Sequence, residues 1–245
     1  MKALILAGGY GTRLAVVAKN TPKPLLIVSG KTLIDYAVEK LKSVAVFSEI
    51  VVVTNNKFYK NFIQWAKAHT DVRIRIVNDG TNTNEERLGS VGDLNYVWSK
   101  ESVADDWLII GGDNLFDQDL GTFMSFAVSK APSVTIGFYD IGDIKAAVKF
   151  GVCALGKNGK VISFQEKPEH PATSKIAMCL YYFPKETLGY IEEYRKESNV
   201  LDAAGSYIKW LSEKKNVYGF NFGGKWYDIG SIESLEEARA HFLKR

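Results

Sequence analysis

The sequence predicts an α/β protein in which a mainly parallel sheet lies between two layers of helices. In the first half of the 245-residue chain, short apolar or β-branched runs alternate with patterns typical of helices, and this order favours a parallel sheet with helices on both faces. In the second half strand patterns become more frequent, and we expect some of them to form a small antiparallel element. The predicted fold class is therefore a Rossmann-like three-layer α/β/α arrangement.

The elements of the first half follow from local patterns. Residues 3–7 form a short apolar run that ends in glycines, which indicates a buried strand. Residues 32–41 place apolar side chains at the spacing of one helix face, and residues 49–54 are β-branched, as strands often are. Further helices are expected at residues 58–68, 92–100 and 119–130, and further strands at residues 72–77 and 106–110. Ligands of such sheets bind at the carboxyl ends of the strands.

The second half combines strands with three further helices. Strands are expected at residues 133–138, 152–155, 161–166 and 178–183, the last three antiparallel, and helices at residues 185–196, 203–213 and 232–242. Asn158 and Gly159 form a hairpin-turn signal between two of these strands. The chain contains no repeat, low-complexity stretch or flexible linker, so we expect a single domain over residues 1–245.

Composition excludes several classes of function. With 31 basic and 28 acidic residues the formal charge is +3, which is too small to indicate nucleic-acid binding but suits anionic phosphate substrates. Cys153 and Cys179 are far apart, so neither a zinc site nor a disulfide framework is expected. The apolar run at the N-terminus is too short for a signal peptide, and no run reaches the roughly 18 residues that span a membrane. We therefore predict a soluble, cytoplasmic protein.

The most informative segment is LAGGYGTRL at residues 6–14, which is followed by TPKPL at residues 21–25. Glycines after a strand let backbone N–H groups approach a phosphate closely. Arg13 and Lys23 add positive charge, and the prolines on both sides of Lys23 stiffen the chain. A P-loop is excluded because no Lys-Ser/Thr pair follows the glycines, and the GxGxxG dinucleotide motif fails at Leu14.

Two aspartates are candidate metal ligands. Asp113 comes directly after the apolar strand predicted at residues 106–110, and Asp228 follows Trp226 and Tyr227. Mg²⁺ prefers a few carboxylates together with phosphate oxygens and water. A single aspartate after a strand can also cap a helix or a turn, and spacing alone does not decide whether these two meet.

The GGxGTRL and PKP motifs resemble the signature of the sugar-1-phosphate nucleotidylyltransferases, a family that includes glucose-1-phosphate thymidylyl- and uridylyltransferases and mannose-1-phosphate guanylyltransferases. The resemblance implies that Mg²⁺ is held by Asp113 and Asp228, and that Arg13 and Lys23 neutralise the leaving pyrophosphate. It also implies a nucleotide-binding half at about residues 1–130 and a sugar-phosphate-binding half at about residues 131–245. The nucleotide-binding residues would be Leu6, Ala7, Gly8, Gly9, Gly11, Thr12, Arg13, Lys23, Asn84, Gly89 and Asp113.

The resemblance extends to the sugar-phosphate side. FGV at residues 150–152 and FQEKP at residues 164–168 are similar to family elements that bind the sugar and its phosphate. A carboxylate can accept hydrogen bonds from sugar hydroxyls, and a lysine can hold the phosphate. The implied sugar-phosphate ligands are Asn114, Gly151, Glu166, Lys167 and Tyr181, and the implied catalytic residues are Arg13, Lys23, Asp113 and Lys167. Cys179 stands where the family usually has glycine, so the sugar pocket is expected to be narrower.

The segment NEERLGSVGD at residues 84–93 is similar to the family's base-reading loop, Q-x₄-G-[TS]-x-G-A. Asn84 occupies the place of the glutamine and keeps an amide donor and acceptor, although its reach is shorter by one methylene. Gly89 matches the first glycine of the loop, and Asp93 replaces the usual alanine. The alternative, that Asn84 is only a loop residue, stays open.

Together these features predict transfer of a nucleotidyl group from a nucleoside triphosphate to a sugar-1-phosphate. The sequence DNLF at residues 113–116 is similar to the thymidylyltransferase branch, so dTTP or UTP and glucose-1-phosphate are the favoured substrates. An anionic nucleophile needs no general base, and catalysis rests on positioning and charge neutralisation. Three alternatives stay open: a guanylyltransferase, a cytidylyltransferase acting on another sugar phosphate or on a phospho-alcohol such as phosphocholine, and a silent nucleotide sensor. We expect no nucleic-acid or membrane partner; a homo-oligomer is kept open because relatives often form one.

Overall fold

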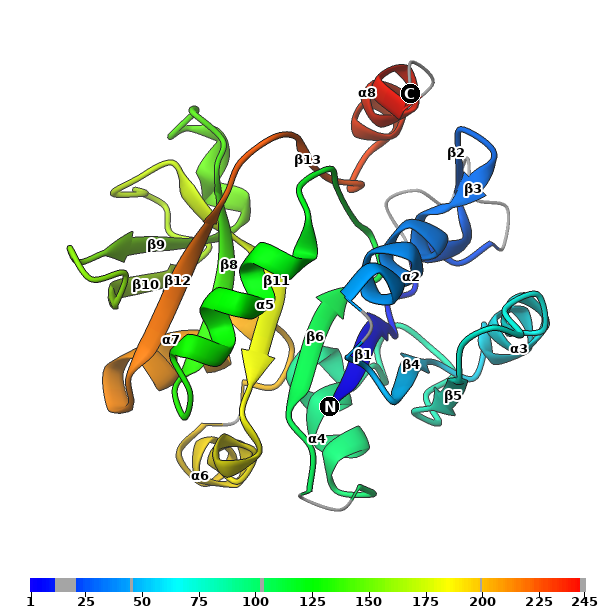
Figure 1. The fold of residues 1–245 in the computed structure, drawn as a ribbon, viewed down its shortest axis with the longest axis horizontal. Helices are drawn as coiled ribbons and strands as arrows, with labels where there is room; N and C mark the ends of the chain where they lie inside the picture. The colour runs from blue at the N-terminus through cyan, green and yellow to red at the C-terminus, as the bar shows by residue number, and fades with distance from the viewer. Residues whose placement is uncertain (12–20, 45, 102–103, 199, 243–245) are drawn as a thin grey trace. The chain divides into compact units, whose positions relative to one another are not determined.

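The computed structural model describes residues 1–11, 21–44, 46–101, 104–198 and 200–242 (Figure 1). The predicted α/β class is confirmed, with helices on both faces of a mixed sheet. The chain forms two compact units. Unit 1 comprises Met1–Leu88, Ile110–Leu120 and Gly224–Arg245, and unit 2 comprises Gly89–Ile109 and Gly121–Gly223. Arg13 and Thr12 lie outside the described residues.

Unit 1 is built on three parallel strands, β1 (Lys2–Ala7), β4 (Glu49–Thr54) and β5 (Ile74–Asn78), which lie side by side in Figure 1. Ala7 pairs with Thr54, and Thr54 with Asn78, so the three carboxyl ends share one edge. Every residue of β4 is buried, as expected of an inner parallel strand rich in valine. The predictions for residues 3–7, 49–54 and 72–77 are confirmed within two residues.

Helices α2 (Leu33–Val44) and α3 (Tyr59–Ala66) belong to the same unit. In α2 the buried side chains recur every three or four residues, which gives the helix one apolar face; they are Leu33, Ile34, Ala37, Val38 and Leu41. The helices predicted at residues 32–41 and 58–68 are therefore confirmed, with ends shifted by up to three residues.

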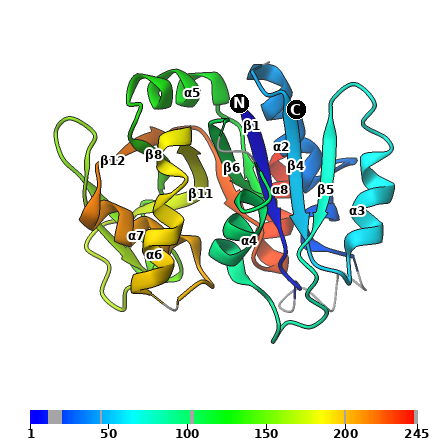
Figure 2. The ribbon, with the colours of Figure 1, turned by 90° about the horizontal axis from the view of Figure 1, so that it is seen from below.

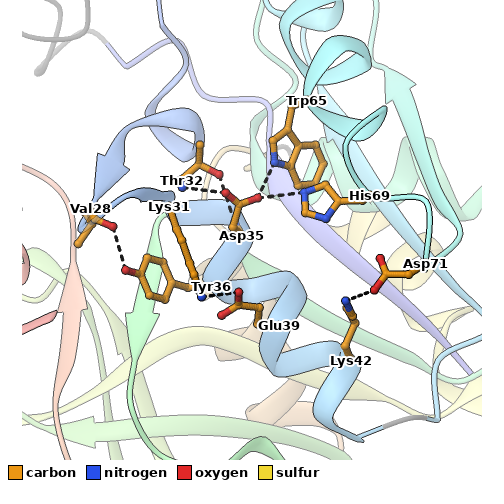
Figure 3. A network of polar contacts seen from close by, with 10 residues as sticks. All are labelled: Val28, Lys31, Thr32, Asp35, Tyr36, Glu39, Lys42, Trp65, His69 and Asp71. Atoms are coloured by element: carbon orange, nitrogen blue, oxygen red, sulfur yellow. Dashed lines mark hydrogen bonds and ion pairs between the residues drawn. The ribbon is translucent and has the colours of Figure 1, made fainter. Parts of the chain in front are cut away.

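The first turn of α2 is fixed by a reciprocal cap, shown in Figure 3. The Asp35 N–H donates to Thr32 Oγ1 at 3.3 Å, and the Thr32 N–H donates to Asp35 Oδ2 at 2.8 Å, the arrangement of a capping box. The other carboxylate oxygen of Asp35 lies 2.8 Å from Trp65 Nε1 and 3.0 Å from His69 Nε2, so it ties α2 to α3. Burial opposes ionisation of Asp35, but the hydrogen bonds from Thr32 and Trp65 more than offset it and hold the pKa of the carboxyl below its usual value.

A second small core completes unit 1. Its buried members are Leu26, Val28, Leu33, Leu115, Ile229, Leu235 and Ala238. They join the hairpin β2 (Ile27–Val28) and β3 (Lys31–Thr32), the antiparallel pair β7 (Asn114–Phe116) and β13 (Trp226–Asp228), and helix α8 (Ile232–Phe242). Of these elements only α8 was predicted. The four strands are two or three residues long, too short for a period of two to be visible in the sequence.

Unit 2 contains five strands and the helices that cover them. Strands β9 (Gly151–Leu155) and β10 (Val161–Glu166) form the predicted antiparallel hairpin, and β11 (Lys175–Phe183) is antiparallel to both β9 and β8 (Val134–Asp140). Strand β12 (Val217–Phe222), which was not predicted, runs parallel to β8.

Aromatic contacts place helices on both faces of these strands. Phe123 of α5 (Leu120–Ser129) packs against Phe222 of β12, and Tyr207 of α7 (Ala204–Lys214) stacks on Phe183 of β11. Figure 2 shows α5 on one side of the strands and α7, with α6 (Tyr190–Glu197), on the other.

Several helix boundaries differ from the prediction. Helix α4 (Gly89–Trp98) begins three residues before the expected start at residue 92. The helix expected from residue 185 divides into a 3₁₀ turn at Lys185–Thr187 and α6. Strand β6 (Trp107–Gly111) and the 3₁₀ turns Lys23–Leu25 and Ala146–Lys149 complete the elements. None of the helices in the described ranges combines the length and apolar character needed to cross a membrane.

We predict that Asp35→Ala destabilises unit 1, because it removes the cap of α2 and the acceptor for Trp65. The loss of a cap costs about 0.5–2 kcal/mol, measured as the free energy of unfolding in denaturant. Because the pKa of Asp35 is lowered in the folded protein, this stabilisation is present above the pKa of an unfolded aspartate and disappears as the pH falls through the lower folded value. The control is Asp71→Ala, which removes an exposed carboxylate that pairs with Lys42 and should change the stability little. Equal stability of Asp35→Ala and the wild type would show that the cap has no energetic role.

Candidate functional site

The glycine-rich segment after β1 is held by hydrogen bonds from the end of the neighbouring strand β4. We call Gly8–Gly11 the phosphate turn. The carbonyl of Ala7 accepts a hydrogen bond from Thr54 Oγ1 at 3.2 Å, and that of Gly8 accepts one from Asn55 Nδ2 at 2.9 Å. Leu6 and Ala7 are the last residues of β1. A Cβ built on Gly9 or Gly11 would meet no heavy atom within 4 Å. In the part of the chain that the structure describes, the outer side of the turn is therefore open.

A second contact that holds the phosphate turn was not predicted from the sequence. Tyr10 Oη donates to Thr81 Oγ1 at 3.0 Å, and Thr81 Oγ1 donates to Asp79 Oδ1 at 2.8 Å. Thr81 and Asp79 are buried and follow directly after β5. Polar residues just past the carboxyl ends of parallel strands are expected near a ligand. The positions of Asn55 and Asp79, directly after β4 and β5, are therefore the sequence pattern from which this contact could have been predicted.

Lys23, Asp113 and Asp228 converge in unit 1, and we call them the carboxylate group. Lys23 Nζ lies 2.5 Å from Asp113 Oδ2 and 3.8 Å from Asp228 Oδ1. The two carboxylate side chains are 33% and 35% exposed, and that of Lys23 is 16% exposed. All three are therefore reachable from solvent although they are held close together.

Each member of the carboxylate group is positioned by its own segment. Lys23 opens a 3₁₀ turn in which the carbonyl of Pro22 accepts from the Leu25 N–H at 2.9 Å. Asp228 ends β13, where it pairs with Asn114 at the start of β7, and the buried Ile229 that follows anchors this end in the second core.

Gly112 brings the Asp113 turn against the end of β1. Its N–H donates to the carbonyl of Leu6 at 2.9 Å. A Cβ at position 112 would lie 2.9 Å from that oxygen and 3.0 Å from Pro24 Cγ, so only glycine fits without displacement. The Asp113 turn therefore lies against the end of β1, the strand from which the phosphate turn continues.

The donor set of the carboxylate group fits Mg²⁺. Two carboxylates from different segments already share one cation, the ammonium of Lys23, and carboxylate oxygens are ligands that Mg²⁺ prefers beside phosphate and water. The described residues contain no cluster of three or more His, Cys, Asp or Glu side chains suited to a metal. The remaining ligands would therefore have to come from a bound substrate or from water.

Asn114, predicted as a sugar-phosphate ligand, is buried in β7. Its side-chain oxygen accepts from Trp226 Nε1 at 2.8 Å. This bond links β7 to β13 beside the backbone pairing of the two strands, so Asn114 helps to hold Asp113 and Asp228 together. Its predicted contact with the sugar phosphate stays a prediction.

In unit 2, Gly151 and Glu166 lie directly opposite each other on β9 and β10. A Cβ on Gly151 would lie 2.5 Å from Phe164 Cζ and 3.0 Å from Glu166 Oε2. Glycine at 151 is therefore required for Glu166 to occupy its place. Lys167 has a positive φ of 46°, its N–H donates to the Phe150 carbonyl at 3.0 Å, and its exposed Nζ lies 3.9 Å from Glu166 Oε1.

Burial controls the electrostatics of this part of unit 2. It raises the pKa of the Glu166 carboxyl, although Lys167 partly opposes the shift. It also raises the pKa of the buried Tyr181 hydroxyl, and the charges of Cys179 and Glu166 add to this effect. Four polar groups therefore interact within unit 2, namely Glu166, Lys167, Cys179 and Tyr181.

Cys179 has a φ of 53°, in the left-handed region that favours glycine. This geometry is consistent with the glycine that the resemblance to the family implies at this position. A side chain in this conformation costs about 1–2 kcal/mol. The Cys179 thiol is also hydrogen-bonded to the Tyr181 hydroxyl, so the substitution changes the polar surface beside Glu166.

The predicted base-reading residues fall on either side of a unit boundary. Asn84 lies in a turn of unit 1, where its carbonyl accepts from Arg87 Nη1 at 3.0 Å. Gly89 begins α4 in unit 2 with a φ of 74°. Their joint contact with a base stays a prediction.

Comparison with known proteins gives consistent results. The chain matches the family model described as nucleotidyl transferase over residues 2–245. It is 28% identical over 249 residues to the bifunctional protein GlmU of Methanocaldococcus jannaschii, an alignment that covers 100% of this chain and 55% of the relative. The chain thus spans about half the length of that curated relative.

A solved structure resembles the whole chain. It is a crystal structure from Bacillus anthracis described as a candidate glucose-1-phosphate thymidylyltransferase in complex with sucrose. The similarity has a TM-score of 0.85 and 25% sequence identity, and it covers 100% of this chain and 96% of the other.

We predict that Glu166→Gln makes the protein more stable at pH 7. The raised pKa of Glu166 means that its ionised form costs stability, a cost that the neutral amide avoids. The difference should vanish as the pH falls below the ordinary glutamate pKa, where the wild-type side chain is neutral in both states. Thermal unfolding measures this, and each kcal/mol corresponds to about 2–4 °C in Tm for a protein of this size. Glu192→Gln, on the exposed face of α6, is the control; an unchanged or lower Tm for Glu166→Gln at pH 7 would contradict the prediction.

Proposed function

Because the chain belongs to the nucleotidyl transferase family, we propose that it transfers a nucleotidyl group from a nucleoside triphosphate to a sugar-1-phosphate and releases pyrophosphate. The observation that carries this proposal is the carboxylate group, in which Asp113 and Asp228 share the cation of Lys23. The Gly112 N–H next to Asp113 is bonded to Leu6 near the end of β1, the strand from which the phosphate turn continues.

The reaction is an in-line displacement. A phosphate oxygen of the sugar-1-phosphate attacks the α-phosphorus, a new phosphorus–oxygen bond forms, and the bond from the α-phosphorus to the bridging oxygen of the β-phosphate breaks. The electron pair of that bond leaves with pyrophosphate. No proton has to be removed from the nucleophile, so the residues of the site act by positioning and by neutralising charge.

The nucleotide is assigned to unit 1. Backbone N–H groups of the phosphate turn contact the triphosphate, and Tyr10 and Asn55 hold the turn in shape. The ammonium of Lys23 turns from Asp113 toward the phosphates, which frees both carboxylates for a metal ion. Mg²⁺ held by Asp113 and Asp228 would supply charge neutralisation at the α-phosphate. Arg13, outside the described residues, is assigned to the pyrophosphate.

The sugar phosphate is assigned to unit 2. Glu166 accepts hydrogen bonds from sugar hydroxyls, the exposed Lys167 neutralises the phosphate, and Tyr181 and Gly151 shape the surface around them. The favoured pair is dTTP or UTP with glucose-1-phosphate. The description of the Bacillus anthracis structure supports this choice, as does the similarity of residues 113–116 to the thymidylyltransferase branch. A cytoplasmic location and a homo-oligomer stay predictions.

A matrix of triphosphates against phosphorylated acceptors tests the proposed function. With Mg²⁺ present, pyrophosphate release is measured for dTTP, UTP, CTP and GTP, each with glucose-1-phosphate, mannose-1-phosphate, glucosamine-1-phosphate or phosphocholine. We expect release with dTTP or UTP and glucose-1-phosphate. Release only with CTP and phosphocholine would replace the proposal by the alternative cytidylyltransferase, and triphosphate binding without any release would favour a silent nucleotide sensor.

We predict that Asp113→Asn and Lys23→Ala each lower kcat by on the order of 10²–10³, the loss typical of one group that stabilises transition-state charge. The control is Lys31→Ala, which removes an exposed cation of unit 1 that pairs with Glu39. Circular dichroism confirms folding, and pyrophosphate release measures turnover. Near-normal turnover in either of the first two variants would refute the role assigned to the carboxylate group.

A further inference from the structure

The N-termini of helices α4 and α7 are interlocked in unit 2. The carbonyl of Asp202 accepts hydrogen bonds from the Ser90 N–H at 2.7 Å and from Ser90 Oγ at 2.9 Å. The same Ser90 Oγ accepts a hydrogen bond from the Ala204 N–H at 2.6 Å. The hydroxyl of one serine near the start of α4 therefore binds both the segment before α7 and the first turn of α7.

This arrangement satisfies the exposed backbone donors of both helices. The first N–H groups of a helix have no partner within the helix and need one from outside. In α4, the Val91 and Gly92 N–H groups donate to the Leu201 carbonyl at 3.1 and 3.3 Å. In α7 the N-cap position is Ala203, which has no side-chain oxygen, so Ser90 supplies the cap from another helix.

Gly89 allows the two helix starts to approach each other. Its φ is 74°, and a Cβ built on it would overlap the Cα of Asp202 and lie 2.6 Å from the Leu201 carbonyl oxygen. A side chain at position 89 would therefore separate α4 from the segment before α7. The glycine assigned to the nucleotide by resemblance thus also has a packing role within unit 2.

The first turn of α7 in turn seats the carboxylate of Glu166. A Cβ on Gly205 would overlap Glu166 Oε2 and lie 2.6 Å from the carboxyl carbon, so the carboxylate rests directly on the backbone of this turn. Any displacement of the first turn of α7 moves the support of Glu166.

We propose that Ser90 is a positioning residue that fixes the first turn of α7 and, through it, the carboxylate of Glu166, so that a residue of the nucleotide loop determines the affinity for the sugar phosphate. This inference rests on the function proposed above, which assigns Glu166 to the sugar. The step from Ser90 to Glu166 passes through hydrogen bonds to Asp202 and Ala204 and through the close packing of Gly205.

The test compares Ser90→Ala, Ser90→Thr and the control Ser99→Ala. Ser99 follows the opposite end of α4, where its hydroxyl bonds only locally, to the Tyr96 carbonyl. Steady-state kinetics gives KM for glucose-1-phosphate, KM for the triphosphate, and kcat. In Ser90→Ala both hydroxyl hydrogen bonds are lost. We expect KM for glucose-1-phosphate to rise about 5- to 10-fold, comparable to the net value of one hydrogen bond, and KM for the triphosphate to change less than about twofold. Threonine keeps the hydroxyl, so Ser90→Thr should behave like the wild type, as should Ser99→Ala.

A purely structural role for Ser90 predicts a different pattern. It would lower stability or kcat in Ser90→Ala and leave the ratio of the two KM values unchanged, and this outcome would overturn the proposal. So would a failure of threonine to restore the wild-type KM for glucose-1-phosphate.

Hydrogen exchange separates a failure of this inference from a failure of the proposed function. In Ser90→Ala the amide of Ala204 should exchange faster than in the wild type and in Ser99→Ala, whether or not the protein releases pyrophosphate. Unchanged exchange would show that Ser90 does not fix the start of α7. If the amide exchanges faster in Ser90→Ala but the wild-type protein releases no pyrophosphate with any acceptor, the proposed function and the effect on sugar affinity are refuted. Only the contact between the two helices then stands.

Discussion

The arrangement of unit 1 depends on one cation shared by two carboxylates. Asp113 and Asp228 are 115 positions apart in the chain, and both reach Lys23. Like charges held this close repel each other, so a positive partner is needed to keep them in place. The short strands β7 and β13 and the small core around Ile229 bring them together. The ammonium of Lys23 supplies this positive partner, at 2.5 Å from Asp113 Oδ2 and 3.8 Å from Asp228 Oδ1.

A second constraint is that the backbone at some positions lies so close to a neighbouring element or side chain that only glycine fits. Such positions occur in both units. At Gly112 the Asp113 turn touches the end of β1, and at Gly151 and Gly205 a strand and a helix start approach the Glu166 side chain. In each case a methyl group would collide with the element or side chain next to a carboxylate, Asp113 or Glu166. At Lys167 and Cys179 the backbone has a positive φ, which favours glycine, and yet each residue carries a side chain. Lys167 follows Glu166 directly in the chain, and Cys179 acts together with Glu166 on the pKa of Tyr181.

Much of the fold could be predicted from the sequence because the main strands and helices have recognisable hydrophobic patterns. β1 and β4 are continuous apolar runs buried on both sides, and α2 has a clear apolar face. The pairing of β7 with β13 could not be predicted, since each strand has three residues and more than a hundred residues separate them. For the same reason the convergence of Asp113 and Asp228 came from the resemblance to a family. The link from Tyr10 to Thr81 and the cap that Ser90 gives α7 join distant segments and leave no local pattern.

The path of the chain through the two units has a practical consequence. The backbone passes from one unit to the other at four places, after Leu88, Ile109, Leu120 and Gly223. Neither unit is a continuous stretch of sequence, so no single uninterrupted segment of the chain contains one whole unit without part of the other. A truncation near residue 130 would keep Lys23 and Asp113 but remove Asp228 and α8, and it would expose the apolar side chains of Leu26 and Leu33 that α8 helps to cover. Unit 1 therefore begins with Met1–Leu88 but is complete only when residues Gly224–Arg245 have been synthesised.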